Sequence, residues 1–342
     1  MADRRLERDF RIDLLRAFAC IMVLFCHAPQ VYEGQGGGFL VGVNNYFGMA
    51  WGPILFFAIT GMCTLNKVQE SLPFLRKRFT RILAPTLVWS ICYICLQWFV
   101  WNTCSPSEFF KMWSGMLIMP QYGSLWFMYA LVSIYLIIPI LSQWVNRCSL
   151  NEIKLYLCLW GICLCLPYIR VFGVDSSPLL DRNGMLFYMY GFLWCTVAGL
   201  YCRNYVRINL KSIGGVLISL FILSSPIIVF LIKYMTGISI TNSLTICSML
   251  TTLYAVVLIY SVDISWIQEN RLFSVIVNNI SKYSFGIYLC HMCFQYPFSH
   301  WIAKFGLNYA FQIPMTVIVV GMLSFCVTWC ISKIPGSKYI IG

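Results

Sequence analysis

The sequence predicts an all-α polytopic membrane protein with about ten transmembrane helices and both termini in the cytoplasm. Of its 342 residues, 60% are hydrophobic and only 11% are charged, whereas ordinary soluble domains carry about 25% charged residues. Apolar runs close to twenty residues recur from one end of the chain to the other, and each is long enough to cross about 30 Å of hydrocarbon. Together these two observations exclude a soluble globular domain.

Hydropathy places ten spans along the chain. The basic segment MADRRLERDFR leads into a run long enough to span and no small-residue cleavage pattern follows, so we expect a membrane helix there, not a signal peptide. The longest outer loops, 33–45 and 102–123, are too short for a folded ectodomain. We therefore expect one integral membrane domain over residues 1–342, without a soluble extracytoplasmic domain. The ten expected spans are 12–32, 46–66, 82–101, 124–143, 153–170, 184–202, 213–235, 242–262, 281–299 and 310–332.

The distribution of Lys and Arg sets the orientation. With the N-terminus in the cytoplasm, nineteen of the 24 basic residues fall on inner segments and the other five on outer segments. Cytoplasmic loops carry such an excess, so both termini are expected inside. The net charge of +12 is then a topology signal. We expect the lipid bilayer as a partner and no nucleic acid, because no basic patch is interleaved with stacking aromatic residues.

The first span carries Asp13, Arg16 and His27 inside an apolar run. At 100° per residue, His27 returns to within about 20° of the face of Arg16, roughly 16 Å further along the axis. Ionisable residues inside a span are costly and usually face a bundle interior or a wet cavity. The pattern therefore predicts a functional site along this helix.

Each of these residues also has a structural interpretation. Arg16 could anchor the helix at the cytoplasmic interface, with Asp13 paired to it at i, i+3. This explanation is weak for His27, which lies roughly 20 Å from the cytoplasmic end of the span. His27 is then either a helix-contact residue hydrogen-bonded to a neighbouring helix or a group that takes a proton from an alcohol.

The seventeen cysteines are scattered through the spans and predict no disulfide framework. Two CxxC pairs occur, at Cys92 and Cys95 and at Cys290 and Cys293. A zinc site needs further ligands that the sequence does not place near either pair. We therefore expect no metal.

Arg16 followed by ten residues and His27 resembles the R-X10-H signature of the membrane-bound acyltransferase family 3. Between about 145 and 275 the resemblance rests on hydropathy alone. Elsewhere four further segments are similar to family motifs in the right order: FFAITGM at 56–62, with Thr60 where Ser is usual, the basic KRFTRILAP at 77–85, GSLWFMYALVSIYLIIPIL at 123–141 and YSFGIYLCH at 283–291.

The resemblance implies transfer of an acyl group, commonly acetyl, from cytoplasmic acyl-CoA to a sugar hydroxyl of a cell-surface polysaccharide or its lipid-linked precursor. It implies the inner membrane of a bacterium and partners in glycan assembly. Asp13, Arg16 and His27 are then the expected catalytic residues. His27 would deprotonate the acceptor hydroxyl or carry the acyl group itself, and Arg16 would hold acetyl-CoA deep in the bundle.

Other residues suit the same chemistry. Arg78 and Arg81 could contact the donor's phosphates or serve as positive-inside anchors. A second stripe in the ninth span could bind the acceptor or supply an oxyanion donor, although the pattern favours interhelical hydrogen bonding. Two aromatic residues of the fourth span could stack on a sugar or belong to the interfacial belt. The stripe is Ser284, Tyr288 and His291, and the aromatic pair is Trp126 and Tyr129.

Two other classes compete with an acyltransferase. In a transporter or flippase of glycan intermediates, His27 and Arg16 would gate a pore without chemistry. A structural scaffold has no need to bury ionisable residues on one face, so the enzyme class is favoured.

Overall fold

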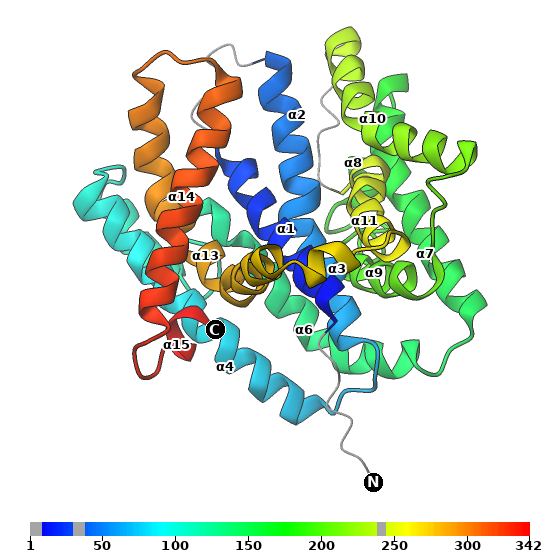
Figure 1. Ribbon diagram of the computed structural model, residues 1–342, viewed down its shortest axis with the longest axis horizontal. Coiled ribbons are helices and arrows are strands. Elements are labelled where there is room, and N and C mark those ends of the chain that lie inside the picture. Colours follow the sequence, from blue (N-terminus) through cyan, green and yellow to red (C-terminus); the bar gives the residue numbers. More distant parts are fainter. Residues whose placement is uncertain (1–8, 30–37, 238–243) are drawn as a thin grey trace.

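A computed structural model describes residues 9–29, 38–237 and 244–342 of the chain (Figure 1). Those residues form helices and turns and contain no strand. The helices are α1 Phe10–His27, α2 Gly38–Met49, η2 Ala50–Ile54, α3 Leu55–Thr64, α4 Ser71–Cys95, η3 Leu96–Val100, α5 Pro106–Gly115, η4 Gly123–Leu125, α6 Trp126–Val145, α7 Leu150–Cys165, η5 Leu166–Phe172, α8 Ser177–Leu180, α9 Leu193–Tyr205, α10 Ile213–Thr236, α11 Ile246–Ser261, α12 Ser265–Glu269, α13 Arg271–Ala303, α14 Tyr309–Ile331 and α15 Lys338–Ile341.

Six helical stretches in the described part of the chain are long and apolar enough to cross a membrane, which confirms the all-α polytopic class. The other four expected spans coincide with shorter or more polar helices. Of these, α9 has 13 residues and α11 has 16, and α1 and α13 carry charged residues within the span. The six stretches are Phe39–Thr64, Ser71–Val100, Gly123–Val145, Leu150–Phe172, Ile213–Lys233 and Tyr309–Ile331.

Several boundaries differ from those that hydropathy predicts, among them the starts of α4 at Ser71 and of α13 at Arg271, which precede the expected spans 82–101 and 281–299. The end of the expected first span and residues 30–37 of the adjoining loop lie outside the described residues, and α2 already begins at Gly38, within the expected loop 33–45. The expected loop 102–123 contains α5. The expected span 184–202 is helical only from Leu193, because Gly184 sits in a turn where a Cβ would lie 2.3 Å from the carbonyl oxygen of Leu179. The mean hydropathy of a window of residues does not reveal such a turn.

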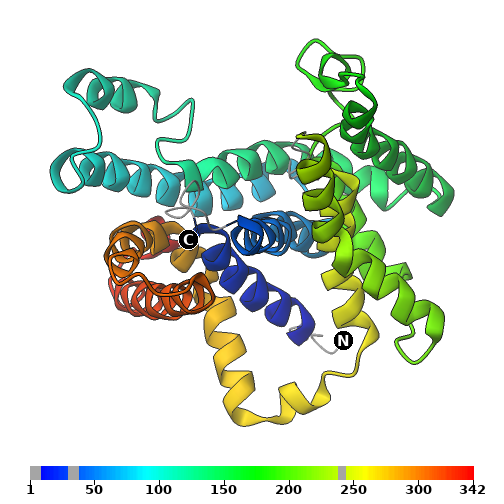
Figure 2. The same ribbon diagram turned by 90° about the horizontal axis from the view of Figure 1, so that it is seen from above.

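The first helix occupies the centre of the bundle. It packs between the α2–α3 segment and the α13–α14 pair, as Figure 2 shows from above. The helix begins at Phe10 because the Asp9 carboxylate caps it, accepting a hydrogen bond of 3.1 Å from the backbone nitrogen of Arg11. Its last residue is His27. The packing therefore presents the two ends of α1 to different neighbours.

Two glycines allow α3 and α9 to pack with their backbones in contact. A Cβ on Gly61 would lie 1.8 Å from the carbonyl oxygen of Thr196, and one on Gly199 would lie 2.5 Å from that of Ala58. Small residues permit such close approach between membrane helices. The contact fixes α3, which carries Cys63, against α9.

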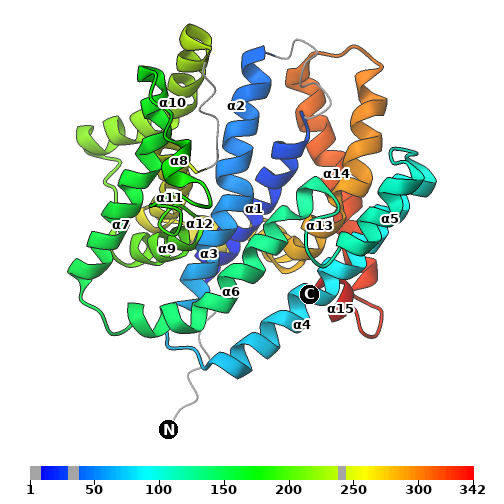
Figure 3. The ribbon, with the colours of Figure 1, turned by 180° about the vertical axis from the view of Figure 1, so that it is seen from behind.

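The fourth helix lies obliquely across the end of the bundle where α1 begins (Figure 3). It packs along α6, and α15 packs on it in turn. The indole nitrogen of Trp89 donates a hydrogen bond of 2.9 Å to the carbonyl of Ile340. These contacts place the basic first half of α4 beside the α6 face that carries Tyr135.

Candidate active site

His27 at the end of α1 lies beside His291 of α13. Their ring centroids are 5.1 Å apart and the ring planes are tilted by 40°. His291 is 0% exposed, whereas His27 is partly exposed. The packing of α1 along α13 thus unites two candidate residues that the sequence places on separate helical stripes.

The hydrogen bonding of His291 assigns its tautomer. Nδ1 lies 2.6 Å from the carbonyl oxygen of Tyr288. Because a carbonyl only accepts, Nδ1 carries the hydrogen and Nε2 carries the lone pair. Within the described part of the chain, this buried Nε2 has no hydrogen-bond partner. Burying an unsatisfied nitrogen is costly, so the site contains an acceptor atom that a hydrogen-bond donor would stabilise.

The other two members of the α13 stripe use their hydroxyls within the protein. Tyr288 donates to the carbonyl of Ser124, and the Ser284 hydroxyl donates to the carbonyl of Ser281 at 2.9 Å. The carbonyl of Ser284 in turn accepts from the thiol of Cys20 at 3.8 Å. The Tyr288 hydroxyl thus bonds to a segment outside α13, as interhelical hydrogen bonding predicts, whereas the Ser284 hydroxyl bonds within α13. His291 is the member of the stripe that adjoins His27.

Two arginines gather around Tyr135 of α6. Arg16 donates a hydrogen bond of 3.4 Å to the sulfur of Cys63 on α3. The guanidinium carbon of Arg78 lies 5.3 Å from the Tyr135 ring centroid and 5.4 Å from that of Phe74. Both guanidinium groups are within electrostatic range of the Tyr135 hydroxyl. We call Arg16, Cys63, Arg78 and Tyr135 the arginine site.

The arginine site has spare hydrogen-bonding capacity. The Nε atom of Arg78 is buried and has no hydrogen-bond partner among the described residues. Arg81, one turn further along α4, is exposed. The structure therefore brings Arg78 and Arg16 to the same tyrosine, whereas Arg81 lies at the surface.

Asp13 faces a different neighbour from Arg16. Its carboxylate accepts a hydrogen bond of 2.5 Å from the hydroxyl of Ser281 on α13, and it is 2% exposed. On the face of α1 between Asp13 and His27, Cys20 is buried against α13 and Leu24 against α14. The stripe that the sequence defines is thus a packing seam along α13 with an arginine at its edge.

The aromatic candidates of α6 lie near its start. Trp126 packs against Phe192 and Phe57, with ring centroids 5.6 and 6.3 Å away. The Tyr129 hydroxyl donates a hydrogen bond of 2.5 Å to the carbonyl of Met116. Both side chains therefore have partners within the bundle.

Sequence reasoning missed a second charged cluster, at the start of α1. Asp9 forms an ion pair of 2.9 Å with Arg203 and accepts a hydrogen bond of 2.6 Å from the Tyr260 hydroxyl. The guanidinium carbons of Arg11 and Arg207 lie 5.5 and 5.6 Å from the Tyr260 ring centroid. From the sequence alone, these basic residues indicate only the orientation of the chain in the membrane. A rare carboxylate next to the first span was the available clue, since the chain has only 12 acidic residues.

The cysteines are free thiols. The described residues contain no group of three or more His, Cys, Asp or Glu side chains that could hold a metal ion. Cys63 is the cysteine that contacts the arginine site.

Residues 9–333 match a known family of acyltransferase domains, the acyltransferase 3 family. The match extends over every helix from α1 to α14. Comparison with curated proteins and with solved structures gave no match. Because the family covers nearly the whole chain, the protein belongs to the acyltransferase 3 family and is a multi-pass membrane acyltransferase.

Proposed function

We propose that this protein transfers an acetyl group from acetyl-CoA to a sugar hydroxyl of a cell-surface polysaccharide or its lipid-linked precursor. It would do so in the inner membrane of a bacterium, alongside the proteins that assemble the glycan. The observation that carries the proposal is the pair of imidazoles at the end of α1, 5.1 Å apart, with His27 accessible and His291 buried. Imidazole takes and returns a proton near neutral pH, which transfer to an alcohol requires.

In the proposed reaction the acceptor hydroxyl attacks the carbonyl carbon of the thioester while His27 takes the hydroxyl proton. The tetrahedral intermediate then collapses, the carbon–sulfur bond breaks, and the departing thiolate takes the proton back from His27. The products are an acetyl ester and CoA with a free thiol. General base catalysis of this kind contributes about 10²- to 10⁴-fold in rate.

Burial divides the roles of the two histidines. His27 is partly exposed, so we assign to it the contact with the acceptor hydroxyl. His291 is fully buried and anchored through Nδ1 to the carbonyl of Tyr288. It therefore acts as a positioning residue behind His27. Two imidazolium charges at this distance would repel each other, so the arrangement disfavours protonation of both rings.

The arginine site is the proposed contact for the donor. A guanidinium group is planar and permanently charged, and it binds phosphate through two parallel hydrogen bonds. Arg16 lies eleven residues before His27, which corresponds to roughly 16 Å along α1. The arm between the phosphates and the thioester of acetyl-CoA would bridge this separation. Arg81, exposed on α4, would attract the anionic donor to the same end of the bundle.

The test compares the O-acetyl content of surface glycan in cells that lack the protein and in cells restored with wild type, His27→Ala or His300→Ala. Mass spectrometry before and after mild alkali measures the esters. His300 is an exposed histidine near the end of α13 and serves as the matched control. We expect wild type and His300→Ala to restore the esters and His27→Ala to fail.

Normal esters with His27→Ala at wild-type membrane levels would overturn the role of His27. A glycan that stays acetylated in cells lacking the protein but no longer reaches the surface would overturn the acyltransferase proposal in favour of a flippase.

A further inference from the structure

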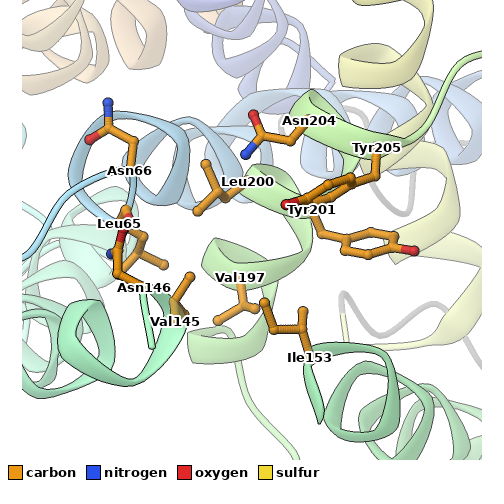
Figure 4. A pocket seen from close by; sticks show the side chains of 10 residues that line it. All are labelled: Leu65, Asn66, Val145, Asn146, Ile153, Val197, Leu200, Tyr201, Asn204 and Tyr205. Atoms are coloured by element: carbon orange, nitrogen blue, oxygen red, sulfur yellow. Dashed lines mark hydrogen bonds between the residues drawn. The ribbon is translucent and has the colours of Figure 1, made fainter. Parts of the chain in front are cut away.

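A cavity of about 150 Å³ lies where α3 and α6 end, α7 begins and α9 ends (Figure 4). Carboxamides and phenols line it above a floor of leucine, valine and isoleucine side chains. Tyr201, Asn204 and Tyr205 come from the last turns of α9, Asn66 follows α3 and Asn146 follows α6. These five residues, which we call the amide pocket, belong neither to the histidine pair nor to the arginine site.

We propose that the amide pocket binds the adenine nucleotide end of acyl-CoA. This inference rests on the proposed function, because it takes an acyl-CoA to be the donor. It assigns to the donor a binding site separate from the arginines that the sequence singles out.

The side chains of the pocket suit a flat purine. Adenine presents an amino donor next to a ring-nitrogen acceptor, and a carboxamide matches that pair with two hydrogen bonds. Aromatic faces stack on bases. Tyr201 and Tyr205 offer such faces, with ring centroids 5.3 Å apart, and Asn204 lies between them in the sequence. The combination supplies both the stacking and the edge recognition that a base requires.

Asn146 adds an oriented acceptor. Its amide nitrogen donates to the carbonyls of Leu65 and Ser142 at 2.9 and 2.7 Å. Both bonds use the nitrogen, so the carboxamide is held in one orientation and its oxygen can accept from an amino group. An amide fixed in this way loses little side-chain freedom when a ligand binds.

The size of the cavity suits a fragment. Pockets that hold whole drug-sized ligands measure roughly 300–1,000 Å³, whereas this one measures about 150 Å³. A single ring system matches that volume and a whole CoA molecule does not. The remainder of the donor must therefore lie outside the cavity.

Positive charge adjoins the pocket where the phosphates of the nucleotide would lie. Arg203 and Arg207 flank Asn204 and Tyr205 in the chain, and with Arg11 they surround the ring of Tyr260. Arg203 is paired with the carboxylate of Asp9. Arg207 donates to the backbone carbonyls of Cys202 and Val206, which do not neutralise its charge. Arg11 donates to the carbonyl of Ile259 and also acts on the carboxylate of Asp263. The three arginines thus outnumber the two carboxylates, and the cluster retains one positive charge for a phosphate group.

One turn of α3 links the pocket to the arginine site. Leu65 lines the cavity, and Cys63, which accepts the hydrogen bond from Arg16, precedes it by two residues, about 3 Å along the helix axis. Arg203 also donates a hydrogen bond of 3.1 Å to the carbonyl of Met62. If the adenine of the donor lies in the amide pocket, the rest of the acyl-CoA therefore extends past Arg16 towards His27.

The test is isothermal titration calorimetry of the purified full chain in detergent, with adenosine 3′,5′-bisphosphate as the probe. We expect wild type to bind the bisphosphate and Asn204→Leu and Tyr205→Ala to weaken binding about tenfold or more. Asn204 and Tyr205 are exposed, so neither substitution disturbs the core. Asn151→Leu is the matched control, because Asn151 is an exposed asparagine at the same end of the bundle that does not line the cavity.

Each outcome decides the proposal. Equal weakening by Asn151→Leu, or no weakening by either pocket variant, places the nucleotide elsewhere and overturns it. Equal displacement of the bisphosphate by ATP and by CoA would assign the pocket to a free nucleotide and would also overturn it. If the bisphosphate fails to bind while wild type still restores His27-dependent O-acetyl esters, the pocket assignment falls and the proposed function stands.

Discussion

The imidazole of His27, at the end of α1, faces the imidazole of His291, in the middle of α13, at a centroid distance of 5.1 Å. His291 is anchored through Nδ1 to the carbonyl oxygen of Tyr288. The acyltransferase thus has a buried imidazole next to a partly exposed one. Replacing His291 tests whether the buried member supports the chemistry or only the packing.

We expect His291→Ala to lower kcat about 10²-fold or more while leaving the KM for acetyl-CoA unchanged, because the donor arginines lie at the other end of α1. His291→Gln keeps an amide donor for the carbonyl of Tyr288 but cannot take a proton. Kinetics of both variants, with thermal unfolding as a check on folding, separate the roles. Full activity in His291→Ala would contradict the positioning role, and full activity in His291→Gln would show that the role needs the hydrogen bond to Tyr288 and no proton transfer by His291.

For Arg78→Ala we expect a KM for acetyl-CoA about ten- to a hundredfold higher, with kcat little changed. Hydrogen bonds to a charged group are worth about 1.5–3 kcal/mol, and about 1.4 kcal/mol corresponds to a factor of ten. Arg76→Ala removes an exposed arginine from the same helix and is the control. Equal effects of the two substitutions would contradict a phosphate contact by Arg78 and would leave it as a positive-inside anchor.

Gly61→Ala should destabilise the folded protein by about 1–3 kcal/mol or more, because the added methyl group would meet the backbone of Thr196. Gly214→Ala, at a helical position of α10 where a Cβ meets nothing within 4 Å, should be neutral or slightly stabilising. Thermal unfolding in detergent measures both. Matching midpoints for Gly61→Ala and wild type would mean that α3 and α9 can separate without cost.

Substitution of Asp9 should destabilise the start of α1. Asp9→Ala removes the cap of the helix, the ion pair with Arg203 and the hydrogen bond from Tyr260. The loss of a cap alone costs about 1 kcal/mol. Glu70→Ala is the control, since Glu70 occupies the same position before α4 without forming a capping bond. A drop in unfolding midpoint no larger than that of Glu70→Ala would contradict the assignment.

The fold class and the two principal residues could be predicted from local properties of the chain. Composition and hydropathy require helices across a membrane, and three ionisable residues in one span single out Arg16 and His27. Periodicity also places His291 on one stripe of its helix. It does not say which neighbour that stripe meets, so the contact with His27 appears only once α1 packs on α13.

The remaining features depend on long-range packing. Arg16 and Arg78 both approach Tyr135 because α4 crosses α6 obliquely, and no local sequence pattern encodes that crossing. The turns that follow Gly184 are invisible to hydropathy because residues 185–190 are Met, Leu, Phe and Tyr. Arg203 is part of a cluster only because α9 approaches the start of α1, where Arg203 pairs with the carboxylate of Asp9.

The backbone contacts of Gly61 with Thr196 and of Gly199 with Ala58 have a mechanical consequence. Helices that touch through their backbones have no side chains between them to rearrange, so α3 and α9 move as one body. That body carries Cys63, which contacts Arg16, and also the carboxamide and phenols of α9. A substrate bound to residues of both helices would therefore move together with them. Opening and closing of the site must then take place along the seams that α1 forms with this body and with α13.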